Sequence, residues 1–86
     1  METQDILAKV KGVVANITGL EPEDIGDDDA FMEDLELDSL SMMEIWVQID
    51  MEFKDHPVKI PNEELPELKT IGQAVARIQQ ALAVAA

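Results

Sequence analysis

The stretch that decides the fold is Ser39-Leu40-Ser41-Met42-Met43-Glu44-Ile45-Trp46-Val47-Gln48-Ile49-Asp50-Met51-Glu52-Phe53-Lys54. It contains neither Gly nor Pro, and its periodicity predicts a helix from Ser39 to Lys54. At about 100° per residue, the apolar side chains fall on two nearly opposite sides of that helix. The first side, which we expect to face the core, holds Met42, Ile45, Trp46, Ile49 and Phe53; the second holds Leu40, Met43, Val47 and Met51.

The second apolar side has two interpretations. A helix in a globular domain needs one apolar side for the core, so a second one bordered by acids such as Glu44 indicates a surface for a partner. The alternative is a central helix that is buried on both sides. In a chain of 86 residues few other elements exist to cover both sides, which favours the partner surface.

Two further main helices are expected around this one. Gln4–Thr18 carries a single apolar stripe, with Thr3 or Asp5 as its cap and Gly19 well placed to end it. Thr70-Ile71-Gly72-Gln73 has the pattern of a capping box, which predicts the start of the last helix.

A long loop is expected between the first and second helices, over Leu20–Leu37. Its Asp27-Asp28-Asp29 run lacks the alternating oxygen ligands and the closing Glu of a calcium-binding loop. We expect four apolar side chains to pin this loop onto the core. They are Leu20, Ile25, Phe31 and Leu35.

The second connection, Asp55–Pro61, is expected to be extended because prolines bracket it. One short helical turn from Asn62 to Leu65 or Leu68 follows, broken by Pro66. No segment alternates as a strand does. The sequence therefore predicts an all-α fold with a single domain over residues 1–86, built as a small bundle of three main helices plus one short helix.

Composition narrows the functional classes. Nineteen acidic residues face six basic ones, which gives a formal net charge of −13. Such a field repels nucleic acid and anionic membranes and favours partners with basic docking patches. The sequence holds no cysteine, no apolar stretch long enough to cross a bilayer and no apolar leader, so we expect a cytoplasmic protein.

Enzymatic chemistry finds little support in the sequence. A serine hydrolase needs a base, yet the single histidine, His56, lies on the loop between prolines, and no Gly-x-Ser-x-Gly motif occurs. Carboxylate pairs such as Glu63 and Glu64 are better explained as solvated surface. Without cysteine or clustered histidine, no metal site is expected. We therefore expect a protein that is not an enzyme.

The segment Asp34-Leu35-Glu36-Leu37-Asp38-Ser39-Leu40-Ser41-Met42-Met43-Glu44, together with Ile60-Pro61 and Leu68-Lys69-Thr70-Ile71-Gly72, resembles the acyl carrier protein family. The likeness is to discrete, actinobacterial-type carriers of fatty acid or polyketide synthesis. It implies that Ser39 bears a 4'-phosphopantetheine arm derived from coenzyme A. It also implies that Asp38 helps to place the hydroxyl and the metal of the attaching transferase.

The same resemblance implies the remaining functional residues and partners. The carrier would hold acyl intermediates as thioesters and deliver them to biosynthetic enzymes. Expected partners are a phosphopantetheinyl transferase, a ketosynthase, an acyltransferase and other enzymes with basic docking patches, and the carrier itself is expected to be a monomer. The implied docking residues are Leu40, Met43, Glu44, Val47, Asp50, Met51 and Glu52, and the implied acyl-pocket residues are Met42, Trp46, Ile71 and Val75.

Three features depart from the family pattern. Glu36 stands where many relatives have Gly, the link from Phe53 to Pro61 is a few residues longer, and Trp46 replaces a smaller aliphatic residue at a core-facing position, which narrows the expected acyl pocket. Two alternatives stay open from the sequence. One is an aminoacyl or peptidyl carrier; the other is an acidic helical adaptor without a prosthetic group, in which Ser39 is only a helix cap.

Overall fold

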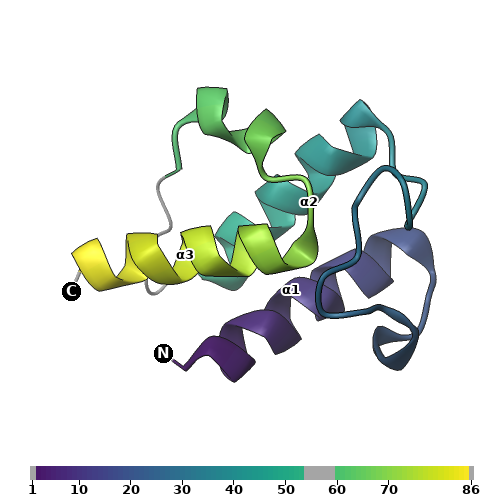
Figure 1. Ribbon diagram of the computed structural model, residues 1–86, viewed down its shortest axis with the longest axis horizontal. Helices are drawn as coiled ribbons and strands as arrows, with labels where there is room; N and C mark the ends of the chain where they lie inside the picture. Colours follow the sequence, from purple (N-terminus) through teal and green to yellow (C-terminus); the bar gives the residue numbers. More distant parts are fainter. Residues whose placement is uncertain (1, 54–59, 86) are drawn as a thin grey trace.

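The computed structural model describes residues 2–53 and 60–85 (Figure 1). Three α-helices dominate it: α1 (Thr3–Thr18), α2 (Ser39–Glu52) and α3 (Ile71–Ala85). Two short 3₁₀ helices, η1 (Pro22–Asp24) and η2 (Asn62–Glu67), lie in the connections. Within these described residues the extended pairing is a single isolated bridge between Ala30 and Thr70. The all-α prediction is confirmed.

The start of α1 differs from the prediction, whereas its end agrees. Glu2 is the N-cap and makes no side-chain capping bond, and the helix begins at Thr3. Neither Thr3 nor Asp5 caps the helix: the Thr3 hydroxyl instead donates to Gln79 Oε1 at 2.7 Å, and so ties α1 to α3. At the other end Gly19 adopts a φ of 81°, the left-handed conformation that Gly tolerates without strain, and its N–H bonds to the Ala15 carbonyl.

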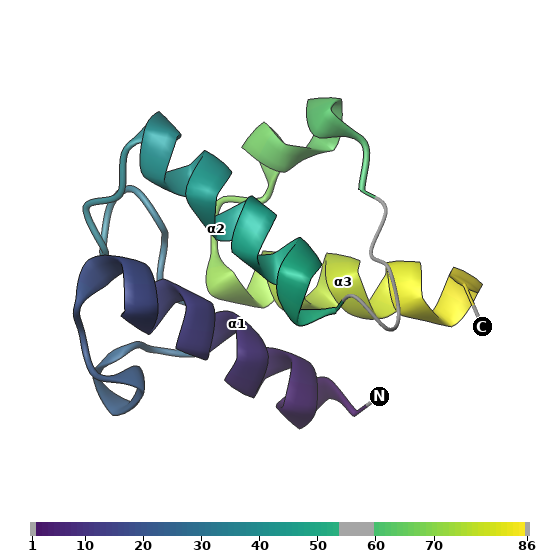
Figure 2. The same ribbon diagram turned by 180° about the vertical axis from the view of Figure 1, so that it is seen from behind.

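The core lies where α1 packs against both α2 and α3 (Figures 1 and 2). Apolar side chains from each helix meet there, and every fully buried residue described is hydrophobic. From α2 and its C-cap the core takes the side predicted for it, with Met42 partly buried at its margin. The core residues of the three helices and of the α2 C-cap are Ile6, Val10, Val13, Val14, Ile45, Trp46, Ile49, Phe53, Ile71, Ala74, Val75 and Ile78.

The opposite side of α2 faces solvent. Leu40, Met43, Val47 and Met51 are between 60% and 67% exposed. The alternative in which α2 is buried on both sides is therefore wrong. An apolar stripe this exposed on a small domain is typical of an interaction surface.

The long loop is held firmly although it is not helical over most of its length. Ile25 and Phe31 are buried as predicted, and Leu35 packs partly buried against the core, but Leu20 is exposed and does not pin the loop. The Phe31 N–H donates to the Lys69 carbonyl at 2.9 Å. These contacts fix the loop beside the segment that leads into α3.

In the segment before α3, the short helix differs from the prediction and the capping box agrees with it. Pro66 does not break the short helix, because η2 runs through it to Glu67; the φ that the proline ring imposes suits a 3₁₀ helix. The capping box forms as predicted: the Gln73 N–H donates to Thr70 Oγ1 at 3.1 Å, and the Thr70 N–H donates to Gln73 Oε1 at 3.3 Å. The predicted end of α2 at Lys54 lies outside the described residues.

An ion pair anchors η2 to α3. Arg77 donates to both carboxylate oxygens of Glu64, from Nε at 2.9 Å and from the second guanidinium nitrogen at 3.1 Å. These hydrogen bonds lower the pKa of Glu64 and raise that of Arg77, so both groups stay charged at neutral pH. The two-point geometry fixes η2 on the side of α2 and α3 that faces away from α1 (Figure 1).

Candidate functional site

The site begins at the N-terminus of α2. Asp38 has an extended backbone and is the N-cap, and its Oδ1 accepts a hydrogen bond from the Ser41 N–H at 2.8 Å. Donation from the Ser41 N–H, and then from the Ser41 hydroxyl, lowers the pKa of Asp38 below its ordinary value. The carboxylate therefore stays charged beside Ser39 at neutral pH.

Ser39 occupies the first helical position and is exposed. Because Asp38 is the cap, the interpretation of Ser39 as only a cap is wrong. The N–H groups of Ser39 and Leu40 belong to the first turn, where a helix offers no carbonyl partner, and the positive end of the helix dipole lies there. An accessible hydroxyl in this position suits a phosphodiester, since a helix N-terminus favours anions.

Glu36 shapes the turn that leads into the site. Its φ of 55° lies in the left-handed region, and it is the one non-glycine residue described with a positive φ. Gly adopts this backbone conformation without strain, so a glutamate here is a locally strained residue. The turn places Leu37 in the core and Asp38 at the N-cap position of α2.

A groove of about 930 Å³ opens beside Ser39. Its walls come from three places: α2, the loop residues 30–33, and the segment 60–69 that contains η2. Sequence reasoning missed the last two walls; the one local signal was the pair of apolar residues Leu65 and Leu68 flanking Pro66. The lining residues are Ala30, Phe31, Met32, Glu33, Ser39, Met42, Met43, Trp46, Val47, Asp50, Ile60, Leu65, Pro66, Leu68 and Lys69.

Two of the four residues expected in an acyl pocket line this groove, and two do not. Met42 and Trp46 lie in the lining, whereas Ile71 and Val75 are buried in the core and take no part in it. The opening therefore lies between α2 and the η2 segment, not between α2 and α3. Close packing around Ile71 and Val75 accounts for the difference, because protein cores leave few voids.

Trp46 is buried, with 8% of its surface exposed, and its Nε1 has no hydrogen-bond partner among the described residues. Buried indole N–H groups usually find an acceptor, and an unmade bond of this kind costs about 1–3 kcal/mol. It is the single buried side-chain nitrogen or oxygen without a partner in the described part of the chain.

The exposed stripe of α2 adjoins the groove. Met43 and Val47 belong to both, and Asp50 lines the groove while Glu44 lies exposed beside the stripe. Glu52, also expected to dock partners, lies elsewhere: it pairs with Lys9 of α1 at 3.8 Å. At 100° per residue Glu52 lies outside the stripe, on the flank of α2 that faces α1.

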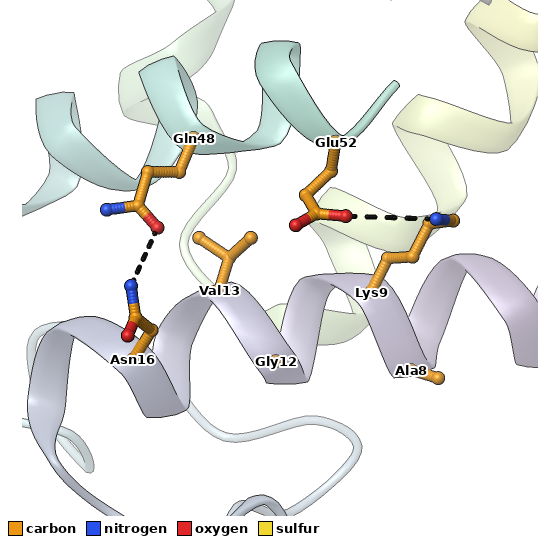
Figure 3. A pocket seen from close by; sticks show the side chains of 7 residues that line it. All are labelled: Ala8, Lys9, Gly12, Val13, Asn16, Gln48 and Glu52. Carbon is orange, nitrogen blue, oxygen red and sulfur yellow. Dashed lines mark hydrogen bonds and ion pairs between the residues drawn. The ribbon is translucent and has the colours of Figure 1, made fainter. Parts of the chain in front are cut away.

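Figure 3 shows the hollow in which Glu52 lies, between α1 and α2. Gly12 and Ala8 leave space on α1, while Asn16 Nδ2 donates to Gln48 Oε1 at 3.2 Å across it. Its volume of about 420 Å³ is less than half that of the groove beside Ser39. None of its lining residues carries a hydroxyl group, and it lies on the other side of α2 from Ser39.

The described residues hold neither a cluster of metal-binding side chains nor a helix that could span a membrane. No three histidine, cysteine, aspartate or glutamate side chains in that part of the chain gather as a metal site would require. None of its helices combines the length and apolarity that crossing a bilayer demands.

Comparisons with known proteins identify the family of the chain. The family model described as "Phosphopantetheine attachment site" matches residues 8–78. The chain is 42% identical over 77 residues to an acyl carrier protein of Rhodococcus erythropolis, covering 90% of this chain and 81% of that one. It is also 42% identical over 77 residues to a meromycolate extension acyl carrier protein of Mycolicibacterium aurum, covering 90% and 76% of the two chains.

A solved structure agrees as well. The acyl carrier protein from Enterococcus faecalis superposes with a TM-score of 0.74 at 28% sequence identity, covering 94% of this chain and 99% of that one. The family model and these relatives together define this small helical protein as a carrier of the phosphopantetheine class. The chain belongs to the acyl carrier protein family, and its prosthetic group is 4'-phosphopantetheine.

Proposed function

We propose that Ser39 is the residue to which the arm is attached, and that α2 presents the carrier to its partner enzymes. The observation that carries the proposal is the position of Ser39: exposed, first in α2, next to the capping carboxylate of Asp38 and in the lining of the groove. Ser41 is less suited, because it lies two positions deeper and is half-buried.

When bound, the arm supplies the thiol that holds an acyl group as a thioester, a group that this cysteine-free chain cannot supply itself. The residues of the chain have different tasks. Ser39 provides the attachment oxygen, and the first-turn N–H groups of α2 face the phosphate. Asp38, held by Ser41, keeps the cap rigid and charged. The apolar groove beside Ser39 offers a sheltered surface to the cargo.

Partner docking is assigned to the exposed stripe Leu40, Met43, Val47 and Met51, with Glu44 and Asp50 as its acidic border. The combination suits an enzyme surface with an apolar patch ringed by basic residues. A phosphopantetheinyl transferase, a ketosynthase and an acyltransferase are the proposed partners. The same proposal has the chain act as a non-catalytic monomer in the cytoplasm.

The proposed cargo is an acyl chain of fatty acid-type elongation. The support is the naming of the relatives, which include acyl carrier proteins and carriers of meromycolate extension. Polyketide or peptidyl cargo is the alternative. It would use the same Ser39 chemistry with different partner enzymes.

The test is to locate the arm in the intact protein. We expect co-expression with a phosphopantetheinyl transferase to add one arm per chain, and fragment-ion mass spectrometry to place it on residue 39. Fragments that place it on Ser41, or a chain that acquires no arm, would contradict the proposal. Acylation of the loaded arm by candidate acyltransferases would then separate fatty acyl from polyketide and peptidyl cargo.

A further inference from the structure

We propose that the Glu64–Arg77 ion pair is a latch that holds η2 in place as a wall of the groove, so that Arg77 is a positioning residue for the shelter of the cargo. Release of this latch lets η2 move away from α2 and exposes the cargo. The inference rests on the proposed attachment at Ser39 and deepens it, because it names the side chains that hold the wall beside the arm.

The first observation is how little else holds η2. Close backbone contacts between the described elements join α1 to α2, to α3 and to η1, and η2 takes part in none of them. Figures 1 and 2 show η2 on the opposite side of α3 from α1. Its apolar residue Leu65 is only partly buried against the core. An element with so few packed contacts opens locally more readily than the core helices do.

The second observation is that, within the described part of the chain, the ion pair is the one polar link between η2 and another helix. Arg77 of α3 donates from two nitrogens to the two carboxylate oxygens of Glu64, at 2.9 and 3.1 Å. A two-point contact of this kind fixes orientation as well as distance, which a point charge does not. The pair therefore sets where η2 lies relative to α3.

The third observation is that the latched element is itself a wall of the groove. Leu65 and Pro66 of η2 line the groove, which opens between η2 and α2. Just after η2 this wall is fixed by the backbone, because the Lys69 carbonyl accepts from the Phe31 N–H at 2.9 Å. Among the described hydrogen bonds, η2 makes no backbone bond of this kind to a distant segment. Its distance from α2 therefore depends on the ion pair.

The position of η2 can be measured before any arm is attached. The chain has no cysteine, so spin labels can be placed at Glu44→Cys in α2 and Glu63→Cys in η2, two exposed positions. We expect double electron–electron resonance to give one narrow distance in this labelled protein. Adding Arg77→Met, which keeps an unbranched apolar side chain but removes every donor, should give a longer and broader distribution.

Three further variants separate the ion pair from a loss of charge or packing. Lys9→Met is the matched control: it makes the same charge change and breaks the Lys9–Glu52 pair on the flank of α2 that faces α1, so the distance should not change. Glu64→Arg with Arg77→Glu rebuilds the pair in reverse and should restore the narrow distance. Glu64→Met breaks the same pair from η2 and replaces Arg77→Met if circular dichroism shows that variant to be unfolded.

The cargo gives a second readout, in unlabelled protein with an octanoyl thioester on the arm. Hydroxylamine should cleave this thioester about two- to threefold faster in Arg77→Met than in the wild type, a modest gain in keeping with a partly exposed ion pair. The Arg77 and Glu64 side chains are 22% and 36% exposed. Lys9→Met and the reversed pair should show the wild-type rate.

The two readouts distinguish failure of the latch from failure of the attachment. An unchanged distance in folded Arg77→Met, a change that the reversed pair does not repair, or cleavage rates that do not follow the distance would overturn the inference alone. A chain that accepts no arm at Ser39 would overturn the proposed attachment, and the role of the latch in sheltering cargo with it. The distances, measured without an arm, would still decide whether the ion pair holds the wall.

Discussion

Glu36 adopts a backbone conformation that favours glycine, although it carries a side chain. It holds a φ of 55°, a conformation that costs a non-glycine residue about 1–2 kcal/mol. We expect Glu36→Gly to raise the free energy of unfolding by about 1 kcal/mol, because the relief of strain exceeds the added freedom of the unfolded chain. Urea denaturation followed by circular dichroism measures the difference.

The matched control for that substitution is Glu33→Gly. It removes the same charge from an exposed residue of the same loop that has no positive φ. We expect it to leave stability unchanged or to lower it. Equal stabilisation by both variants would assign the effect to charge and would contradict the strain.

The lowered pKa of Asp38 makes the stability of the folded protein depend on pH. Its pKa is lower in the folded protein than in the unfolded chain because Ser41 donates to the carboxylate. The stability that it contributes is therefore fully present above its ordinary pKa of about 4 and is lost as the pH falls through the lower folded value. Asp38→Asn keeps a capping side chain but does not titrate. We expect the wild type to be the more stable at pH 6 and this advantage to shrink by pH 3, measured by urea midpoints; a constant difference would contradict it.

The surface of helix α2 has three parts: one packs in the core, one lines the groove and one faces solvent. If the exposed stripe docks partners, Val47→Arg and Glu44→Lys should slow acyl transfer several-fold at low salt while leaving the helix content unchanged. The loss of a rim charge acts mainly on the association rate, so the effect of Glu44→Lys should diminish as salt is added. Stopped-flow or radiolabel transfer assays with a ketosynthase provide the rates.

The control is Glu52→Lys, which makes the same charge change on the flank of α2 that faces α1, beside Lys9. We expect transfer rates in this variant to stay close to those of the wild type. Equal losses in Glu44→Lys and Glu52→Lys would show that partners sense only the total charge, and would remove the docking role from the stripe.

How well the sequence predicted the elements depended on how local the signals were. Gly19, the Thr70–Gln73 box and the two sides of α2 were all predicted correctly, since each follows from spacing within a few residues. The groove could not be predicted, because two of its walls have no period of their own and meet through a tertiary contact, Phe31 N–H to Lys69 carbonyl. Periodicity placed Ile71 on an inward face without telling whether core or cavity lay there.

Over the whole molecule, the nineteen acidic residues outnumber the six basic ones and repel one another. The chain carries −13 within dimensions of 33 × 26 × 19 Å. The screening length falls from about 30 Å at 0.01 M salt to about 8 Å at 0.15 M, so at low salt each charge acts across the molecule and at 0.15 M it does not. We expect the melting temperature to rise over this range, as measured by calorimetry.

A charge-reduced variant tests the cause of that rise. Glu33→Lys brings the formal net charge from −13 to −11 at an exposed position, and its melting temperature should depend less steeply on salt. A melting temperature that is flat with salt in the wild type would mean that repulsion does not limit the stability of this fold.

The assignment on which the whole molecule's function depends is Ser39 as the one point of attachment. The most direct measurement is the intact mass of three proteins, wild type, Ser39→Ala and Ser41→Ala, each incubated with coenzyme A and a phosphopantetheinyl transferase. Circular dichroism first establishes that all three are folded. We predict that the wild type and Ser41→Ala each gain the mass of one phosphopantetheine arm, and that Ser39→Ala gains none. An arm on Ser39→Ala, or its loss from a folded Ser41→Ala alone, would contradict the assignment.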